Sequence, residues 1–301
     1  MKKILVIGCH GFTGRHLLPL LQRQGEWEIY GAGLEAPAPV EVEGFFRCSV
    51  TEAADIRAAL QQCRPDYVIN LAGSFSLRKE HDFAVNVDGP RNILEALISL
   101  GLKDTRTLLI GSSAEYGPGK EGVPLREDDP LNPQNVYGES KVAQSKLLYE
   151  YQGRLPIMLA RSFNLIGRWA PPALFSGAFF EKVKAFQNGE IRRLDLLDLS
   201  AYRDYLDIRD AVHAYMTLLQ RGKAGEIYNV ARGIATPVLD IVKFTQECLQ
   251  IPPELITYKA TGEGRGVAYQ VGAIDKIKEL DWQPRYILRE SVAYILEHLG
   301  E

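Results

Sequence analysis

The fold of this chain is decided by the stretch Ile4-Leu5-Val6-Ile7-Gly8-Cys9-His10-Gly11-Phe12-Thr13-Gly14. Four apolar residues typical of a buried strand run directly into three glycines. Residues 15–23 then place leucines on one helical stripe, Gly25 ends that helix, and residues 29–32 predict a second strand. Strand, glycine loop, helix and strand follow one another in the order of a dinucleotide-binding unit.

Each glycine of this loop has a distinct expected role. Gly8 allows a tight turn, Gly11 lets a pyrophosphate approach the backbone, and Gly14 lets the helix pack closely on the strand. The phosphates would lie at the positive end of the helix, and we expect Phe12 and Thr13 to contact the same cofactor. Glycines at this spacing are weak evidence alone, and a turn without a ligand is the alternative. The preceding strand and following helix favour the cofactor.

The spacing Gly-x-x-Gly-x-x-Gly resembles the extended branch of the short-chain dehydrogenase/reductase superfamily, which includes nucleotide-sugar epimerases, dehydratases and reductases. The resemblance implies an α/β fold: a Rossmann-type doubly wound parallel sheet with a smaller C-terminal lobe that closes over the substrate. We expect residues 1–167 and about 201–235 to form the NAD(P)-binding domain. Residues of about 168–200 and 236–301 would form the substrate-binding lobe.

Composition excludes several other classes of protein. The 301 residues are 46% hydrophobic and 24% charged, with a net charge of −3, so nothing indicates a nucleic-acid or anionic-membrane partner. No apolar run approaches the ~20 residues of a membrane span, and we expect no cleavable signal, because the first apolar run is short. The cysteines show no metal spacing, so we expect a cytoplasmic protein without a metal whose thiols are reduced and buried or semi-buried: Cys9, Cys48, Cys63 and Cys248.

Further cofactor contacts are implied by the resemblance. Ser49-Val50 stands where the family has an acidic-apolar pair that holds adenine, and Ser49 can accept the same hydrogen bond without charge. Leu71-Ala72-Gly73 matches a family turn beside the cofactor, although a buried strand with a small-residue turn would read the same. Asn86 opens the signature over residues 86–96, in which a proline predicts a kink near Gly89-Pro90.

The choice between NAD(H) and NADP(H) is weakly encoded. NAD enzymes place a carboxylate after the second strand, and NADP enzymes place an arginine there. No arginine follows this strand, and Glu35 comes one or two positions late. We therefore expect NADH, or use of both cofactors.

Two Tyr-x-x-x-Lys matches occur, Tyr116/Lys120 and Tyr137/Lys141. The first spans Gly117-Pro118-Gly119, which cannot form a helix, so its two side chains share no face. The second lies in a plausible helix start, where residues four apart project from the same side. Only the second pair can therefore act together.

Hydride addition to a ketone creates an alkoxide that needs a proton donor. A free tyrosine has a pKa of ~10. A lysine ammonium one turn away and a positive nicotinamide ring favour the phenolate and so lower this pKa. A serine at the end of a neighbouring strand can hydrogen-bond the same oxygen. Ser112 is the candidate catalytic serine beside Tyr137 and Lys141, and Ser113 is the alternative. A structural tyrosine on a surface helix is the competing interpretation.

Substrate contacts are also implied by the resemblance. Asn164 would contact the sugar nucleotide, and Arg203, with Arg265, would hold its diphosphate; Arg203 could instead pair with a local carboxylate. The irregular loop over residues 168–177 departs from the family pattern. The remaining candidate substrate contacts are Ser74, Ser113, Ala114 and Glu115.

Three reactions share this frame. Dehydratases place an acidic pair after the serine, but Ser113 and Ala114 occupy those positions, and Glu115 would point the other way on an extended chain. The pattern looks most like the GDP-4-keto-6-deoxymannose reductases, which implies reduction of a nucleotide-linked 4-keto-6-deoxyhexose at C4. A 4-epimerase with tightly bound NAD is the alternative, and a non-catalytic NAD(P)-binding sensor is a minor one. The resemblance also implies a homodimer through helices 82–100 and 137–151.

Overall fold

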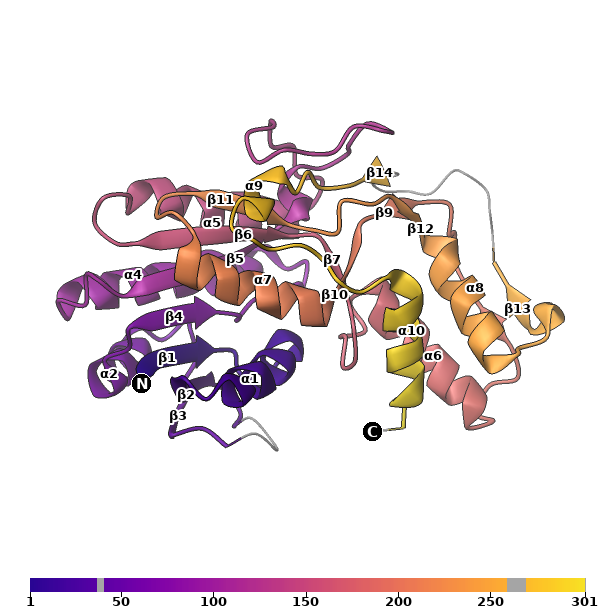
Figure 1. Ribbon diagram of the computed structural model, residues 1–301, viewed down its shortest axis with the longest axis horizontal. Helices are drawn as coiled ribbons and strands as arrows, with labels where there is room; N and C mark the ends of the chain where they lie inside the picture. Colours follow the sequence, from indigo (N-terminus) through magenta and orange to yellow (C-terminus); the bar gives the residue numbers. More distant parts are fainter. Residues whose placement is uncertain (37–40, 259–268, 301) are drawn as a thin grey trace.

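The computed structural model of the chain describes residues 1–36, 41–258 and 269–300. Its centre is a seven-stranded sheet whose neighbouring strands all pair in parallel (Figure 1). The strand order reverses between β1 and β4, which is where doubly wound sheets bind their ligands. From edge to edge the strands are β11 (Ile227–Val230), β6 (Ile157–Ser162), β5 (Arg106–Ser112), β4 (Tyr67–Asn70), β1 (Lys2–Ile7), β2 (Trp27–Gly33) and β3 (Gly44–Arg47).

Helices cover both faces of this sheet. On β1, Ile4 and Val6 pack into one buried cluster, and Leu5 and Ile7 pack into another, because successive side chains of a strand point to opposite faces. The helices on the first face are α1 (Phe12–Gln24) and α7 (Ile208–Arg221), and those on the second are α2 (Ala53–Cys63), α4 (Gly89–Ser99) and α5 (Val136–Glu150). The predicted doubly wound sheet is therefore confirmed.

The long helix expected over residues 82–100 is divided into three pieces. A short helix α3 (Lys79–Phe83) leads into a π-helical turn, η1 (Ala84–Asp88), and α4 begins directly after it. Pro90 follows Gly89, whose N–H bonds the Ala84 carbonyl, and has no N–H to continue this helical ladder. The irregularity therefore precedes the proline, as a π turn.

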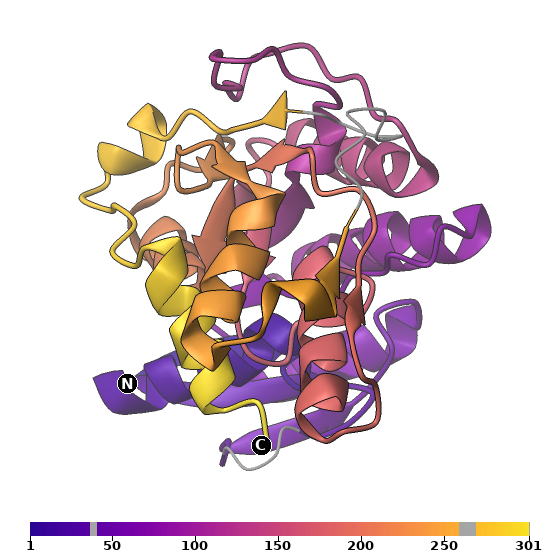
Figure 2. The ribbon, with the colours of Figure 1, turned by 90° about the vertical axis from the view of Figure 1, so that its right-hand side faces the viewer.

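A third apolar cluster forms among helices that lie beyond the carboxyl edge of the sheet and face the viewer in Figure 2. It joins α6 (Phe175–Gln187), α8 (Val238–Leu249) and α10 (Leu288–Glu297), which lie within the expected C-terminal lobe. Ile274, Ile277 and Trp282 pack instead with α7 in the first cluster. The small elements of this half are β7 (Asn164–Ile166), β8 (Leu194–Asp195), β9 (Tyr202–Arg203), β10 (Tyr205–Asp207), β12 (Thr236–Pro237), η3 (Pro253–Leu255), β13 (Ile256–Thr257), β14 (Tyr269–Gln270) and α9 (Asp275–Lys278).

Alternating cations and aromatic rings connect α1 to α10, and we call them the aromatic ladder. Guanidinium-to-ring distances range from 3.7 Å for Arg209 over Tyr286 to 5.9 Å for Arg168 over Tyr294. Such contacts stabilise by about 0.5–2 kcal/mol each. In order, its members are Arg15, Trp169, Arg168, Tyr294, Arg209 and Tyr286.

The four cysteines are free, and three of them are buried. Burial raises the pKa of the Cys9 thiol to about 11 and that of Cys63 to about 12. Cys248 is exposed, so the expectation of a buried or semi-buried thiol is wrong there. Among the residues that the structure describes, no group of side chains could hold a metal ion, and no helix is long and apolar enough to cross a membrane.

Candidate active site

The glycine loop after β1 has the geometry that a pyrophosphate requires. Gly8 has a φ of +80°, and a Cβ there would lie 2.7 Å from the Ala72 nitrogen. A Cβ on Gly14 would lie 2.2 Å from the Cys9 carbonyl oxygen, so helix and strand pack too closely for a side chain. Gly11 begins α1 without a side-chain cap, which leaves the first N–H groups of the helix for an anion.

A cavity of about 300 Å³ lies at this edge of the sheet. It brings the glycine loop, the turn after β4 and the end of β5 to the Tyr137/Lys141 pair, so the residues present fit a dinucleotide. Its lining residues are Gly8, Gly11, Phe12, Thr13, Leu71, Ala72, Gly73, Ser74, Phe75, Ile110, Gly111, Tyr137, Lys141 and Pro171.

Tyr137 and Lys141 lie one turn apart on α5. The side chain of Asn135 caps this helix by accepting the Gly138 N–H at 2.8 Å. Lys141 donates to the Ile110 carbonyl and to the Gln144 side chain, both at 2.8 Å. Burial lowers the pKa of the Lys141 ammonium to about 8, and the negative charge of Glu115 opposes this shift.

Ser112, and not Ser113, is the serine that the structure brings to Tyr137. The hydroxyl groups of Ser112 and Tyr137 share a hydrogen bond, which opposes the rise in the Tyr137 pKa caused by burial. Ser113 is buried, and its hydroxyl donates to the Gln270 side chain at 3.0 Å. The structure thus brings Ser112 to Tyr137 and bonds Ser113 elsewhere, and the role of Ser112 as the catalytic serine stays a prediction.

The other Tyr-x-x-x-Lys match has a structural tyrosine. The Tyr116 hydroxyl is buried and donates to the Asn229 side chain at 2.7 Å. Arg161 donates to the same hydroxyl at 3.2 Å. Tyr116 therefore has no route to a substrate.

The loop after β4 is held by two buried polar side chains. Asn86 accepts the Ser74 N–H at 2.9 Å and donates to the Ser74 carbonyl at 2.8 Å and to the Ser140 hydroxyl at 2.9 Å. Asp82 accepts the Ser74 hydroxyl at 2.7 Å. Asn86, expected to contact the cofactor, thus uses its amide to position the loop that lines the cavity.

Glu115 does not line the cavity. Residues Ser113–Glu115 form a short 3-10 helix, η2, so the alternation of an extended chain does not apply. The Glu115 side chain is fully buried and forms an ion pair with Arg161. Ala114 packs its carbonyl oxygen against Gly138 of α5. Glu115 and Ser113, both expected to contact substrate, thus have buried side chains that are bonded inside the protein.

The expected adenine-side residues lie at the ends of β2 and β3. Ser49 bonds the Thr51 hydroxyl at 2.8 Å, and buried Val50 packs against Gly89. Glu35 is exposed, two residues beyond β2. Arg47, which sequence reasoning did not select, donates to the Leu34 carbonyl at 3.2 Å and so places a cation near Glu35.

Two expected substrate residues lie beyond the cavity, on β7 and β9. The guanidinium of Arg203 donates to the Tyr202 carbonyl at 2.9 Å, and desolvation lowers its pKa. No carboxylate of the described residues pairs with it, so the local ion pair weighed above is not found. Asn164 is half-buried, and its buried amide nitrogen has no described hydrogen-bond partner. Arg265 lies outside the described residues.

Phe75 and Pro171 are cavity residues that sequence reasoning missed. Phe75 is 42% exposed and packs its ring edge-on against Tyr137, with centroids 4.8 Å apart. Pro171 follows the aromatic ladder in the irregular loop after β7. Neither has a sequence signal, because each reaches the cavity through a long-range contact.

Comparison with known proteins identifies the family. Residues 4–231 match the NAD dependent epimerase/dehydratase family, so the chain belongs to it. A dTDP-6-deoxy-L-talose 4-dehydrogenase (NAD(P)(+)) of Kitasatospora kifunensis is 30% identical over 298 residues, which cover 96% of this chain and 93% of that protein. A GDP-6-deoxy-D-mannose reductase of Pseudomonas aeruginosa is 26% identical over 98% of this chain and 96% of its own.

Solved structures share the whole fold. The structure of RMD from Pseudomonas aeruginosa complexed with NADPH covers 100% of both chains, with a TM-score of 0.85 and 24% identity. A Thermus thermophilus UDP-glucose 4-epimerase complex with NAD has the same TM-score and identity over 99% of both chains. The predicted extended short-chain dehydrogenase/reductase fold is thus confirmed, and the chain is an NAD(P)-dependent oxidoreductase.

Glu35→Arg is expected to shift cofactor preference towards NADPH by about tenfold in the ratio of kcat/KM values, because an arginine can pair with a 2′-phosphate and a carboxylate repels it. Steady-state kinetics with both cofactors measures this ratio. Glu26→Arg is the matched control, since the exposed Glu26 lies at the opposite end of β2. An unchanged ratio in the Glu35 variant would remove Glu35 from the cofactor site.

Proposed function

We propose that the protein reduces the C4 ketone of a nucleotide-linked 4-keto-6-deoxyhexose, with a GDP-linked substrate favoured, in deoxysugar biosynthesis. The observation that carries the proposal is the Ser112–Tyr137–Lys141 site at the dinucleotide cavity, without the acidic pair of a dehydratase beside it. The names of the two relatives above, a 6-deoxytalose 4-dehydrogenase and a 6-deoxymannose reductase, support the same chemistry.

Ser112, Tyr137 and Lys141 have different proposed roles in protonating the ketone oxygen. A bound NADH or NADPH supplies the hydride to C4. Tyr137 donates its phenolic proton to the developing alkoxide, and Ser112 donates a hydrogen bond at the same place. The Lys141 ammonium stabilises the phenolate that remains, while its bond to the Ile110 carbonyl fixes its position.

Arg203 and Asn164 are proposed to bind the nucleotide part of the substrate. A guanidinium without a described carboxylate partner suits diphosphate oxygens. The unpaired amide nitrogen of Asn164 can donate to the same ligand. We retain Arg265 as the second diphosphate contact on resemblance alone.

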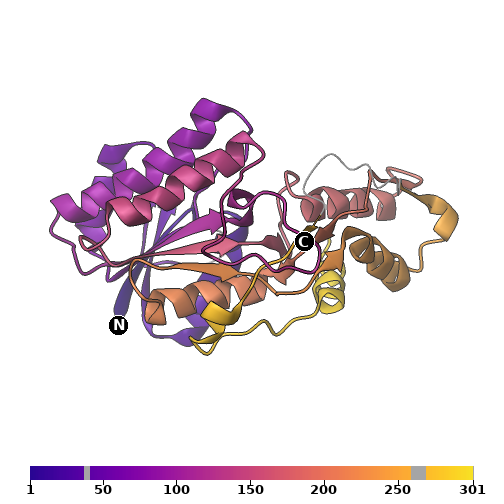
Figure 3. The ribbon, with the colours of Figure 1, turned by 90° about the horizontal axis from the view of Figure 1, so that it is seen from above.

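Two further properties belong to this proposal. The protein forms a homodimer through the face of α4 and α5, which lie side by side (Figure 3) and are joined by the Arg91–Glu150 ion pair at 2.8 Å. Tyr149, 62% exposed on α5, offers apolar area to a second subunit. The protein acts in the cytoplasm, with no nucleic acid or membrane as partner.

The test is an assay of the pure protein with NADH or NADPH and GDP-4-keto-6-deoxymannose, then the dTDP-linked 4-keto-6-deoxyglucose. Steady oxidation of the cofactor with one substrate is expected. No oxidation with either, together with a dinucleotide released on denaturation, would favour the 4-epimerase. Dinucleotide binding without turnover of any sugar nucleotide would favour the non-catalytic sensor. The presence of the Tyr137/Lys141 pair argues against a sensor.

Arg203→Lys is expected to raise KM for the sugar nucleotide by about tenfold, because an ammonium cannot make two parallel bonds to a phosphate. The Kd for NADPH should stay unchanged. Arg193→Lys, in an exposed ion pair with Asp195, is the control and should alter neither constant. Equal KM values in both variants would show that Arg203 does not bind the substrate.

A further inference from the structure

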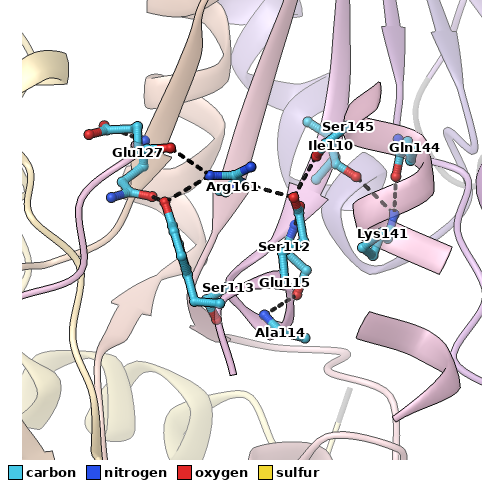
Figure 4. A network of polar contacts seen from close by, with 12 residues as sticks. Ile110, Ser112, Ser113, Ala114, Glu115, Glu127, Lys141, Gln144, Ser145 and Arg161 are labelled. Carbon is cyan, nitrogen blue, oxygen red and sulfur yellow. Dashed lines mark hydrogen bonds and ion pairs between the residues drawn. The ribbon is translucent and has the colours of Figure 1, made fainter. Parts of the chain in front are cut away.

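Glu115 forms the centre of a buried polar network that reaches Ser112 and the helix α5 (Figure 4). One carboxylate oxygen accepts the Ser112 N–H at 2.9 Å. The other accepts the Nε–H of Arg161 at 2.8 Å and the hydroxyl of Ser145. A single side chain thus joins the end of β5, the strand β6 and the helix α5.

These partners lie where they can control the geometry of the site. Tyr137, Lys141 and Ser145 are spaced four residues apart on α5, so they share one face of the helix. Glu115 is therefore bonded both to the backbone of Ser112 and to the helix face that carries the other two catalytic residues.

The strand β5 leaves room for the Glu115 carboxylate because it has a glycine, Gly111, at the point of contact. A Cβ on Gly111 would lie 2.7 Å from the nearer Glu115 oxygen and 2.8 Å from Leu159. Arg161 balances the buried charge and in turn donates to the Glu127 carbonyl at 2.9 Å. A buried carboxylate costs several kcal/mol unless it is paired in this way.

We propose that Glu115 is the positioning residue of the active site: a buried anion that holds Ser112 and the Tyr137–Lys141 face of α5 in fixed register. This inference rests on the proposed function only for its kinetic readout. The electrostatic effect of Glu115 can be tested without the reaction, because its negative charge favours the charged form of Lys141 in the protein alone. The other groups bonded to or facing that ammonium are uncharged: the Ile110 carbonyl, the Gln144 amide and the Tyr137 ring.

Ser145→Ala tests the link to α5, because it removes one bond and leaves the Glu115–Arg161 ion pair. We expect kcat to fall about tenfold or more, with KM for both substrates within twofold, since small displacements of catalytic groups have large effects on rate. Thr245→Val is the matched control, because it deletes a buried hydroxyl that donates to the Ile241 carbonyl at 2.8 Å in α8, outside the site and the aromatic ladder. Equal kcat values in the two variants would overturn the positioning role.

Glu115→Gln tests the charge without any substrate. Titration of Lys141 by NMR in the cofactor-free protein is expected to give a pKa below that of the parent, whereas Ser145→Ala leaves it unchanged. An unchanged Lys141 pKa in Glu115→Gln would overturn the electrostatic part. If Glu115→Gln fails to fold, the Ser145 and Thr245 variants still decide the positioning role. A parent protein inactive on both sugar nucleotides would contradict the proposed function, while the Lys141 titration would still decide this inference.

Discussion

Replacing Tyr137 with phenylalanine is expected to lower kcat for ketone reduction by about 10²- to 10⁴-fold, the usual contribution of a general acid. The ring remains, so its edge-on contact with Phe75 and the shape of the cavity are kept. Only the proton and its hydrogen bond to Ser112 are lost. Steady-state kinetics at saturating cofactor measures the effect, and the Kd for NADPH should change little.

The control for this variant is Tyr149→Phe, on the same helix. Tyr149 lines no part of the cavity, and phenylalanine keeps the ring that the proposed subunit contact would use, so the loss of the hydroxyl should leave kcat unchanged. If Tyr137→Phe retained the parent kcat, Tyr137 would not be the proton donor, and the mechanism proposed for this site would be wrong.

Lys141→Met is expected to lower kcat by about 10²-fold or more, because the phenolate loses the only neighbouring ammonium on its helix face. Methionine has a similar length and no charge, so packing is largely preserved. Binding of the dinucleotide should also weaken, since Lys141 lines the cavity. Lys146→Met, an exposed position on α5, is the matched control and should keep the parent rate. A Lys141 variant as active as the control would exclude the lysine from catalysis.

A pH dependence follows from the burial of Lys141. Its pKa is lowered to about 8, so the ammonium loses its proton as the pH rises through that value. The kcat/KM of the parent, which reports groups of the free enzyme, should therefore fall above pH about 8. The profile of Lys141→Met should lack this limb, and its persistence there would assign the limb to another group.

The parts of the site that could be predicted are those set by local geometry. The glycine loop could be predicted because its residues are adjacent in the sequence. Tyr137 and Lys141 could be paired because they lie one turn apart on the same helix. The direction of the Glu115 side chain could not be predicted, because a 3-10 turn and not an extended chain starts at Ser113. The contributions of Phe75 and Arg47 depend on contacts between segments far apart in the chain, which spacing cannot reveal.

The aromatic ladder connects the helix α10 to the loop that lines the dinucleotide cavity. Tyr294 of α10 stacks with Arg168, three residues before Pro171 in the loop that reaches the cavity, and Trp169 of the same loop stacks with Arg15 of α1. A truncation that removed the last helix would leave that loop without its outer support, although the nearest glycine of the loop after β1 is far away in sequence. Engineers who shorten the chain or fuse a partner to it should therefore treat α10 as part of the dinucleotide site.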